Sequence, residues 1–275
     1  MQNKNIVVAS DFSPRSIEII KKAEQFAKKN SANLHIVHAV EIPFFSAAID
    51  INSICASSYE TLLQHFPKFE KHHYHCQSGN IEDVIANYCH KVDAKLLILA
   101  SSGERNSLKK LLLGSSIKSI IRELNIPAIV VKSDNELDFS HVMITTDLSE
   151  KSLEFITKVK AILPQSNIKL FYTYALPYEN RLHFYGLKDS EISLFQKELK
   201  SEAQKEVEQF FEKLPIEKNN VEMVFQEGYL DTEFFINEAK KMNSDLIAMH
   251  TTGKFSFFAL DLLEDSDIDV MIAKV

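Results

Sequence analysis

The sequence predicts an α/β fold of two tandem doubly wound domains, each built on a five-stranded parallel sheet. The first observation is that short apolar runs alternate with helical patterns along the whole 275-residue chain. The second is a long internal repeat, because the pattern of the first half begins again near residue 139. Alternating strands and helices favour a parallel sheet with helices on both faces, and a repeat of this length indicates a duplicated domain.

The first half contains five expected strands separated by helices. Each strand is a short apolar run that stops at a polar turn, a glycine or a proline. Ser13 followed by Pro14 is typical of a helix start, with a hydroxyl cap and a proline at the first helical position. The expected strands are 6–10, 34–40, 74–77, 96–100 and 128–131, and the expected helices are 14–29, 59–66, 81–92 and 117–124.

The second half repeats the first with an offset that grows along the chain. The end of the first strand recurs 136 residues later, the glycine turn before the third helix 149 residues later, and the fourth strand with its turn 150 residues later. Loop insertions within a duplicated domain explain a growing offset. The matched segments are DFS at 11–13 and DLS at 147–149, QSGNIED at 77–83 and QEGYLDT at 226–232, and DAKLLILASSG at 93–103 and NSDLIAMHTTG at 243–253.

A polar, aperiodic stretch at 133–138 is the expected linker, so the expected domains are 1–132 and 139–275. The charge is uneven across this boundary. Residues 1–137 hold 16 basic and 14 acidic side chains, a charge of +2, and the remaining 15 basic and 24 acidic side chains give −9. Nucleic-acid binding needs a clustered basic face, so this balance argues against such a partner.

Composition excludes several other classes of protein. A hydrophobic share of 45% with 25% charged residues is that of a globular protein with apolar cores. No signal-peptide pattern and no run of about 18 apolar residues is present, so the expected location is the cytoplasm, without a membrane partner. The three cysteines, Cys55, Cys76 and Cys89, form no CxxC pair, which argues against a disulfide framework and a zinc ribbon.

A candidate anion site follows the fourth strand. A small-residue turn at 101–103 ends that strand, and Gly-Ser-Ser at 114–116 begins the next helical pattern. Backbone N–H groups at a glycine turn and at a helix N-terminus can surround a phosphate, and Arg105, Lys109 and Lys110 suit the same ligand. The alternative is a plain loop followed by a capped helix.

Asp11 ends the first strand and is expected to lie at the same edge of the sheet as Gly103. Ligands of doubly wound sheets bind at the carboxyl ends of the strands, where the strand order reverses, and an acidic residue there commonly binds sugar hydroxyls. The alternative is that Asp11 and Ser13 only cap the first helix. The two roles are compatible.

Each half resembles a universal stress protein domain, and the whole chain resembles a tandem member of that family. The motifs that carry the resemblance are DFS at 11–13, KLLILASSG at 95–103, LLLGSS at 111–116 and the following IPAIVV strand. Nucleotide-binding members show Gly-x-x-Gly, nine residues, and then Gly-Ser or Gly-Thr. Here the first position is Ala100, and ten residues separate Gly103 from Gly114, so the motif is altered in two places.

The resemblance implies the fold of the adenine nucleotide alpha hydrolases, with the two domains packed as an internal pseudo-dimer through the strands at 128–131 and 270–274. It implies ATP or AMP as the ligand of the first domain, with or without Mg²⁺, a role in stress-response regulation and a possible homodimer. The residues implied to contact the nucleotide are Ala9, Ser10, Asp11, Ala39, Val40, Leu99, Ala100, Ser102, Gly103, Arg105, Gly114, Ser115 and Ser116.

Two further function classes compete with nucleotide binding. A partner-binding module that no longer binds nucleotide is favoured by Ala100 and the longer loop. An ATPase or phosphotransferase is disfavoured because the chain has no Walker lysine motif and no catalytic base stands out near the loop, so weak ATPase activity is the most that we expect. We expect no catalytic residues.

The second half keeps the turn at 250–253 but has lost the phosphate loop. The segment 254–269 holds one base, Lys254, no glycine and five carboxylates, Asp269 included, which would repel a triphosphate at close range. We therefore expect one nucleotide site per chain, although Asp147 remains.

A histidine-rich stretch and an aromatic-rich stretch are both expected to serve the structure and not a ligand. In the stretch His72-His73-Tyr74-His75-Cys76, alternation places His73 and His75 on one face of a strand, and no spacing matches a known metal-ligand pattern, so no metal site is expected. Aromatic residues after the second strand of the second half are expected to pack in the core or between domains, with an apolar ligand pocket as the alternative. They are Tyr172, Tyr174, Tyr178, Phe184 and Tyr185.

Overall fold

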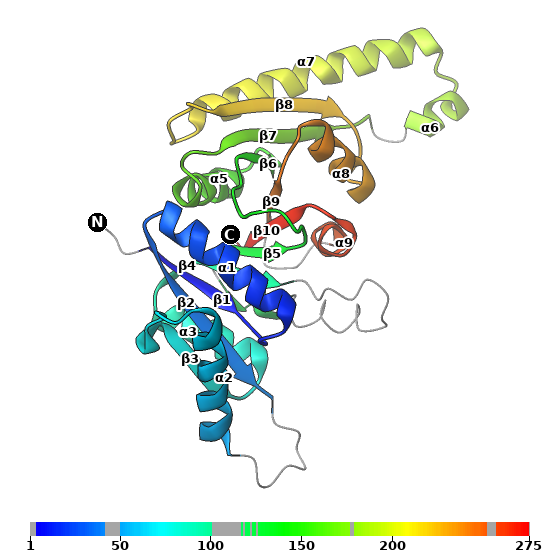
Figure 1. Cartoon of the computed structure of the whole chain (residues 1–275). Helices are drawn as coiled ribbons and strands as arrows, with labels where there is room; N and C mark the ends of the chain where they lie inside the picture. The colour runs from blue at the N-terminus through cyan, green and yellow to red at the C-terminus, as the bar shows by residue number, and fades with distance from the viewer. Residues whose placement is uncertain are drawn as a thin grey trace. The chain divides into compact units, whose positions relative to one another are not determined.

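The computed structural model describes residues 4–41, 50–100, 117, 119–121, 123–124, 126–176, 179–251 and 257–274. The chain divides into two compact units, residues 1–138 with 251–275, and residues 139–250 (Figure 1). The N-terminal segment of the first unit ends at residue 138, which is the last residue of the predicted linker. The predicted domain extents, 1–132 and 139–275, follow the repeat and stay a prediction.

The first unit is an α/β sandwich around a sheet with the strand order β3-β2-β1-β4-β5-β10. The first five strands run parallel, as predicted, and the order reverses between β1 and β4. Its strands are β1 (Lys4–Ala9), β2 (Ala32–Val40), β3 (Tyr74–Ser78), β4 (Ala94–Ala100), β5 (Ala128–Val131) and β10 (Asp269–Lys274). Its helices are α1 (Pro14–Lys29), α2 (Ile51–His65), the 3₁₀ turn η1 (Lys71–His73), α3 (Ile81–Lys91) and α9 (Phe257–Asp265), and residues 117, 119–121 and 123 are also helical.

Strand β10 belongs to the second sequence repeat but pairs with β5 of the first. The two strands are antiparallel, with Val270 opposite Val130 and Ile272 opposite Ala128. The predicted pairing of the two fifth strands is therefore confirmed. An open edge strand of a parallel sheet exposes unpaired backbone groups, and this exchange satisfies those of β5.

The core of the first unit follows from the predicted periodicities. Leu97 and Ile98 of β4 are completely buried, as expected for a strand covered on both faces. Helix α1 buries Ile19, Ile20 and Ala23 on the stripe that the helical spacing predicts.

The second unit repeats the same topology in the strand order β9-β6-β7-β8, and all pairs within it are parallel. Its strands are β6 (His141–Thr145), β7 (Asn167–Tyr174), β8 (Val221–Glu227) and β9 (Leu246–Thr251). Its helices are α5 (Glu150–Ile162), α6 (Glu179–Leu182), the 3₁₀ turn η2 (His183–Tyr185), α7 (Asp189–Lys213) and α8 (Thr232–Lys241).

The insertion that lengthens the repeat lies between β7 and β8. The connection from β2 to β3 has 33 residues and that from β7 to β8 has 46, a difference of 13 that accounts for the rise in offset from 136 to 149. The longer connection holds α7, a 25-residue helix that runs alongside β8 (Figure 1).

Two predictions about side chains in the C-terminal half are corrected by the structure. Phe184 and Tyr185 are 89% and 67% exposed, so they do not pack in a core. Tyr172 and Tyr174 are half-buried on β7, and Tyr178 lies outside the described residues. Asp269 is not a loop carboxylate: it is buried at the start of β10 and accepts hydrogen bonds from the backbone N–H groups of residues 132 and 133, each at 2.8 Å.

No helix in the described part of the chain is both long enough and apolar enough to cross a membrane.

Candidate functional site

The carboxyl ends of β1, β2 and β4 form one edge of the first sheet, next to the point where the strand order reverses. Ala9 of β1 lies opposite Leu99 of β4 in the strand register. This edge brings together the described members of the predicted set, Ala9, Ser10, Asp11, Ala39, Val40, Leu99 and Ala100. The other predicted residues, Ser102, Gly103, Arg105, Gly114, Ser115 and Ser116, lie outside the described residues, as do Lys109 and Lys110.

A tight turn at the end of β1 fixes the carboxylate of Asp11. Its Oδ1 accepts hydrogen bonds from the backbone N–H of Ser13 at 3.0 Å and from the hydroxyl of Ser16 at 2.6 Å. Between them, Phe12 has a φ of 58°, and its N–H donates to Oγ of Ser10 at 3.0 Å. Few non-glycine residues adopt this left-handed conformation, so the bonds around Phe12 hold a strained turn in place.

The carboxyl group of Asp11 is ionised at neutral pH. Burial alone would raise its pKa, but the hydrogen bonds from Ser16 and Ser13 outweigh burial and lower the pKa below its ordinary value. The hydrogen bonds from the N–H of Ser13 and from the hydroxyl of Ser16 both fall on Oδ1.

The cap of α1 falls on Ser13, as predicted. Its side chain accepts from the backbone N–H of Ser16, and Pro14 occupies the first helical position. Asp11 supports this cap from two residues further out. The capping role of Ser13 and a ligand role for Asp11 are therefore compatible.

An open cavity of about 430 Å³ lies beside Asp11. One wall consists of Asp11, Phe12 and His38, whose ring centroid is 5.0 Å from that of Phe12. His38 Nδ1 lies 2.8 Å from the carbonyl oxygen of Ser10, so Nδ1 donates the hydrogen in this bond. The other wall is one face of α2, with Ser53, Ile54, Ser57, Ser58 and Thr61.

Sequence reasoning missed this second wall. The expected helix began at Tyr59, whereas α2 begins at Ile51, and the lining residues recur at spacings of three and four along it. Residues at this spacing share one face of a helix. An expected helix that began near residue 51 would therefore have shown that these side chains form one surface. His38 and Phe12 were also not among the predicted contacts.

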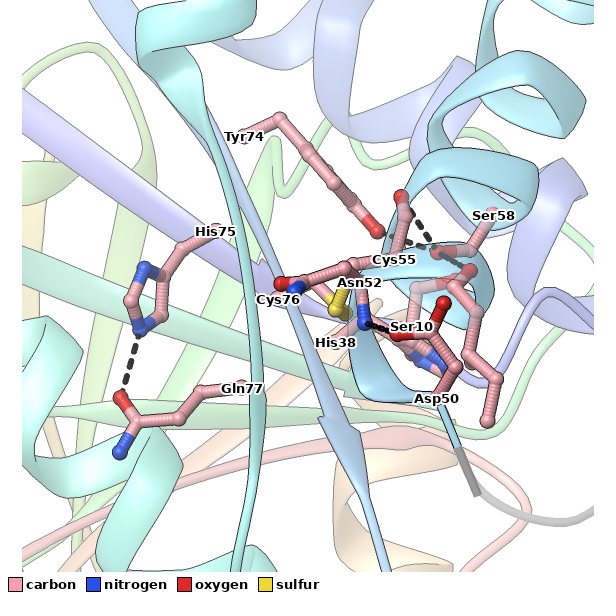
Figure 2. The surroundings of a disulfide bond; sticks show 11 residues. Ser10, His38, Asp50, Asn52, Cys55, Ser58, Tyr74, His75, Cys76 and Gln77 are labelled. Atoms are coloured by element: carbon pink, nitrogen blue, oxygen red, sulfur yellow. Dashed lines mark hydrogen bonds between the residues drawn. A yellow bond between two sulfur atoms is a disulfide. The ribbon is translucent and has the colours of Figure 1, made fainter. Parts of the chain in front are cut away.

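A disulfide bond between Cys55 and Cys76 ties α2 to β3 (Figure 2), although the cysteine pattern argues against a disulfide framework. The two residues are 21 positions apart, and their Cα atoms lie 5.6 Å apart. The two cysteines meet because α2 packs on β3, and residue spacing along the sequence does not predict such a contact. Beside the bond, the hydroxyls of Tyr74 and Ser58 lie 2.6 Å apart. Cys89 is a buried free thiol, and burial raises its pKa to about 12.

The edge of the second sheet reproduces the Asp11 turn 136 residues later. Oδ1 of Asp147 accepts from the N–H of Ser149 at 3.0 Å and from the hydroxyl of Ser152 at 2.6 Å. Leu148 has a φ of 62°, and its N–H donates to Oγ1 of Thr146 at 3.0 Å. These distances equal those around Asp11, so the duplication extends to individual hydrogen bonds.

A histidine beside the carboxylate is one difference between the two edges. The position of Ala100 in the first repeat is taken by His250 in the second, and Nε2 of His250 lies 3.8 Å from Oδ2 of Asp147. The His250 side chain is only 7% exposed, and its pKa is lowered by burial, although the Asp147 carboxylate opposes this shift. An imidazole therefore occupies space beside Asp147 where the first repeat has a methyl group.

Comparison with known proteins agrees with this architecture. The sequence profile of the universal stress protein family matches residues 2–132. Universal stress protein A homolog 1 of Coxiella burnetii is 30% identical over 132 residues, which cover 44% of this chain and 90% of the relative. The chain belongs to the universal stress protein family. A universal stress protein of Methanocaldococcus jannaschii is 26% identical over 140 residues, covering 47% of this chain and 82% of that protein.

Solved structures extend the family fold to the whole chain. A putative universal stress protein of Pseudomonas aeruginosa UCBPP-PA14 has a TM-score of 0.65 at 13% identity, covering 99% of this chain and 94% of that one. A universal stress protein of Archaeoglobus fulgidus has a TM-score of 0.64 at 16% identity, covering 98% and 96%. These likenesses show the α/β fold along the full length of this universal stress protein.

Proposed function

We propose that this universal stress protein binds an adenine nucleotide, ATP or AMP, in its first unit and acts as a regulator of the stress response rather than as an enzyme. The observation that carries the proposal is the ionised carboxylate of Asp11, held beside a cavity at the reversal point of the sheet. Doubly wound sheets bind nucleotides at this point, and a strand-end acidic residue there binds ribose hydroxyls.

The proposed binding of the nucleoside rests on the structure, and the proposed binding of the phosphates rests on the sequence. Oδ2 of Asp11 would accept from the ribose hydroxyls, and the cavity between Phe12, His38 and α2 offers an aromatic and hydroxyl-lined space for the rest of the nucleoside. The phosphates, with or without Mg²⁺, are assigned to the glycine segments at 103 and 114–116 on the basis of their sequence. The N–H groups of such segments favour anions.

The second unit is proposed to bind no nucleotide. Asp147 is held as Asp11 is, but His250 lies beside it, and the segment after the turn at 250–253 lacks the second glycine. The pairing of β5 with β10 supports the further proposal of an internal pseudo-dimer. A homodimer and a cytoplasmic location remain predictions of the sequence.

A partner-binding module without nucleotide is the second candidate function. It is favoured by Ala100 at the position of the family's first glycine and by the ten residues between Gly103 and Gly114. A substitution of Ala for Gly is costly only where the backbone needs a positive φ.

The repeat supplies a matched pair of variants that tests the proposal, Asp11→Asn and Asp147→Asn. Each removes one charge from the same hydrogen-bond network, so their effects on stability should be similar. Only Asp11→Asn should weaken ATP binding, by roughly 10- to 100-fold, the value of a charged hydrogen bond. Titration calorimetry of both variants and of the unchanged protein measures this. Equal ATP affinities for the two variants would contradict the site, and no ATP binding by the unchanged protein would favour the partner-binding module.

A further inference from the structure

A cluster of metal-ligating side chains lies at the opposite edge of the first sheet. Glu70, His72 and His73 sit on and just before η1, which leads directly into the amino end of β3. One possible ligand atom from each of the three residues lies within 4.8 Å of the other two. Nδ1 of His72 is 3.2 Å from Oε2 of Glu70. The cluster is separate from the candidate nucleotide edge, which is formed by the carboxyl ends of the strands.

We propose that Glu70, His72 and His73 bind one divalent transition-metal ion of the zinc class. Two imidazole nitrogens and one carboxylate oxygen form a donor set that suits Zn²⁺, with water completing a tetrahedral arrangement. A neutral imidazole binds a metal ion through the ring nitrogen that carries no proton. The sequence spacing predicted no metal site, because the three ligands converge through the 3₁₀ turn and not through a common ligand pattern.

Packing around His73 restricts the position of its ring. The centroids of the His73 and His35 rings are 4.5 Å apart, and those of His72 and His73 are 4.1 Å apart. His35 is buried in β2, and its Nδ1 lies 3.1 Å from the hydroxyl of Tyr88. A ligand that is already oriented loses less conformational entropy on binding.

Lys71, the lysine within η1, has its ammonium group over two aromatic rings. Nζ of Lys71 lies 3.8 Å from the ring centre of Tyr59 and 4.8 Å from that of Tyr74. Its ammonium group is thus engaged with aromatic rings, which attract cations through their electron-rich faces. The Glu70 carboxylate supplies a negative charge to the proposed ligand set, which favours a cation.

The second repeat has a similar sequence without the histidines before β8, although residues 219–220 form a simple turn there and not a 3₁₀ helix. The sequence Glu-Lys-His-His at 70–73 precedes β3, and Glu-Lys-Asn-Asn at 217–220 precedes β8. Lys218 also lies over an aromatic ring, with Nζ 5.0 Å from the ring centre of Phe211. The glutamate, the lysine and its aromatic contact are therefore common to both repeats, and the histidine pair is specific to the first. We expect one metal ion per chain.

This repeat also defines the test, because His72→Asn together with His73→Asn copies the sequence of the second repeat. Calorimetric titration of the full chain with Zn²⁺ at pH 7.5, without nucleotide or chelating buffer, should give one site with a dissociation constant on the order of 10 μM. The double variant should bind at least about a hundredfold more weakly, since it loses two of three ligands. Its melting temperature without metal should stay close to that of the unchanged protein.

Two further variants separate the site from a general effect of histidines. His75→Asn alters a histidine that stacks on Tyr88 and is not in the cluster, so zinc affinity should be retained. Glu70→Gln keeps the shape of the side chain and removes the charged ligand, so zinc affinity should fall at least about tenfold. The proposal is overturned if the unchanged protein does not bind Zn²⁺, or if the double variant binds it as well as the unchanged protein does. Neither result bears on nucleotide binding, because no nucleotide is present.

Discussion

Reduction of the disulfide between Cys55 and Cys76 should destabilise the first unit and loosen α2. In the chain-entropy account, a cross-link between residues 21 positions apart stabilises the folded state by about 3 kcal/mol. Leu62 is the one buried side chain among the residues of α2, and the half-buried Tyr59 packs on Tyr74 of β3 with ring centroids 5.2 Å apart. The disulfide, together with the contact between Ser58 and Tyr74, is therefore a main attachment of this helix to the sheet (Figure 2).

The expected shift in melting temperature follows from this free energy. A unit of 150–250 residues loses roughly 2–4 °C for each kcal/mol, so a loss of about 3 kcal/mol should lower its melting temperature by about 6–12 °C. Because α2 forms one wall of the cavity beside Asp11, the reduced protein should also bind ATP more weakly. Amide hydrogens of α2 should exchange faster after reduction, since less of the structure must open to expose them.

Thermal melts with and without a phosphine reductant measure the effect, and a thiol count on the denatured protein verifies the redox state. The count should rise from one thiol, Cys89, to three on reduction. The double variant Cys55→Ser with Cys76→Ser should melt like the reduced protein and should not respond to the reductant. Cys89→Ala should keep the full response. Three thiols before reduction would refute the bond, and an unchanged melt when the count rises from one to three would refute its contribution to stability.

Two further predictions concern His250 of β9 and Gly114 of the candidate phosphate segment. The pKa of His250 is lowered by burial, so the unfolded state binds a proton more readily, and the free energy of unfolding should fall as the pH drops below about 6.5. His250→Asn should show a smaller loss over the same pH range in denaturant titrations, and an identical loss would contradict this assignment. Gly114→Asp should weaken ATP binding roughly a hundredfold, because a carboxylate would face the phosphates, whereas Gly114→Ala should weaken it less. Equal ATP affinity for Gly114→Asp and the unchanged protein would show that this segment does not bind phosphate.

Sequence reasoning succeeded where a pattern has a local physical cause. The apolar run of β4, the buried stripe of α1 and the cap at Ser13 each reflect a single element, and the structure contains all three. The repeat was equally visible, because Asp11 and Asp147 end equivalent strands. The position of Asp11 at the reversal point follows from the order of the elements, since parallel strands place their carboxyl ends at one edge.

The features that were missed depend on contacts between elements. The first turns of α2 bury no large apolar side chain, so the periodicity that marks a helix was weak there. The disulfide needs α2 to pack against β3, and the cluster at Glu70 needs a 3₁₀ turn, neither of which is encoded by residue spacing. The sequence predicts a loop at Asp269 because its partners, the backbone N–H groups of residues 132 and 133, are more than 130 residues away.

The number of ATP molecules bound per chain tests the central claim most directly. Titration calorimetry of the unchanged, oxidised protein with ATP should give one site per chain, because the Asp11 edge has an adjoining cavity and the Asp147 edge has His250 beside its carboxylate. Two equivalent sites would show that His250 and the altered second segment do not prevent binding. No measurable binding would contradict the assignment of a nucleotide to the Asp11 edge.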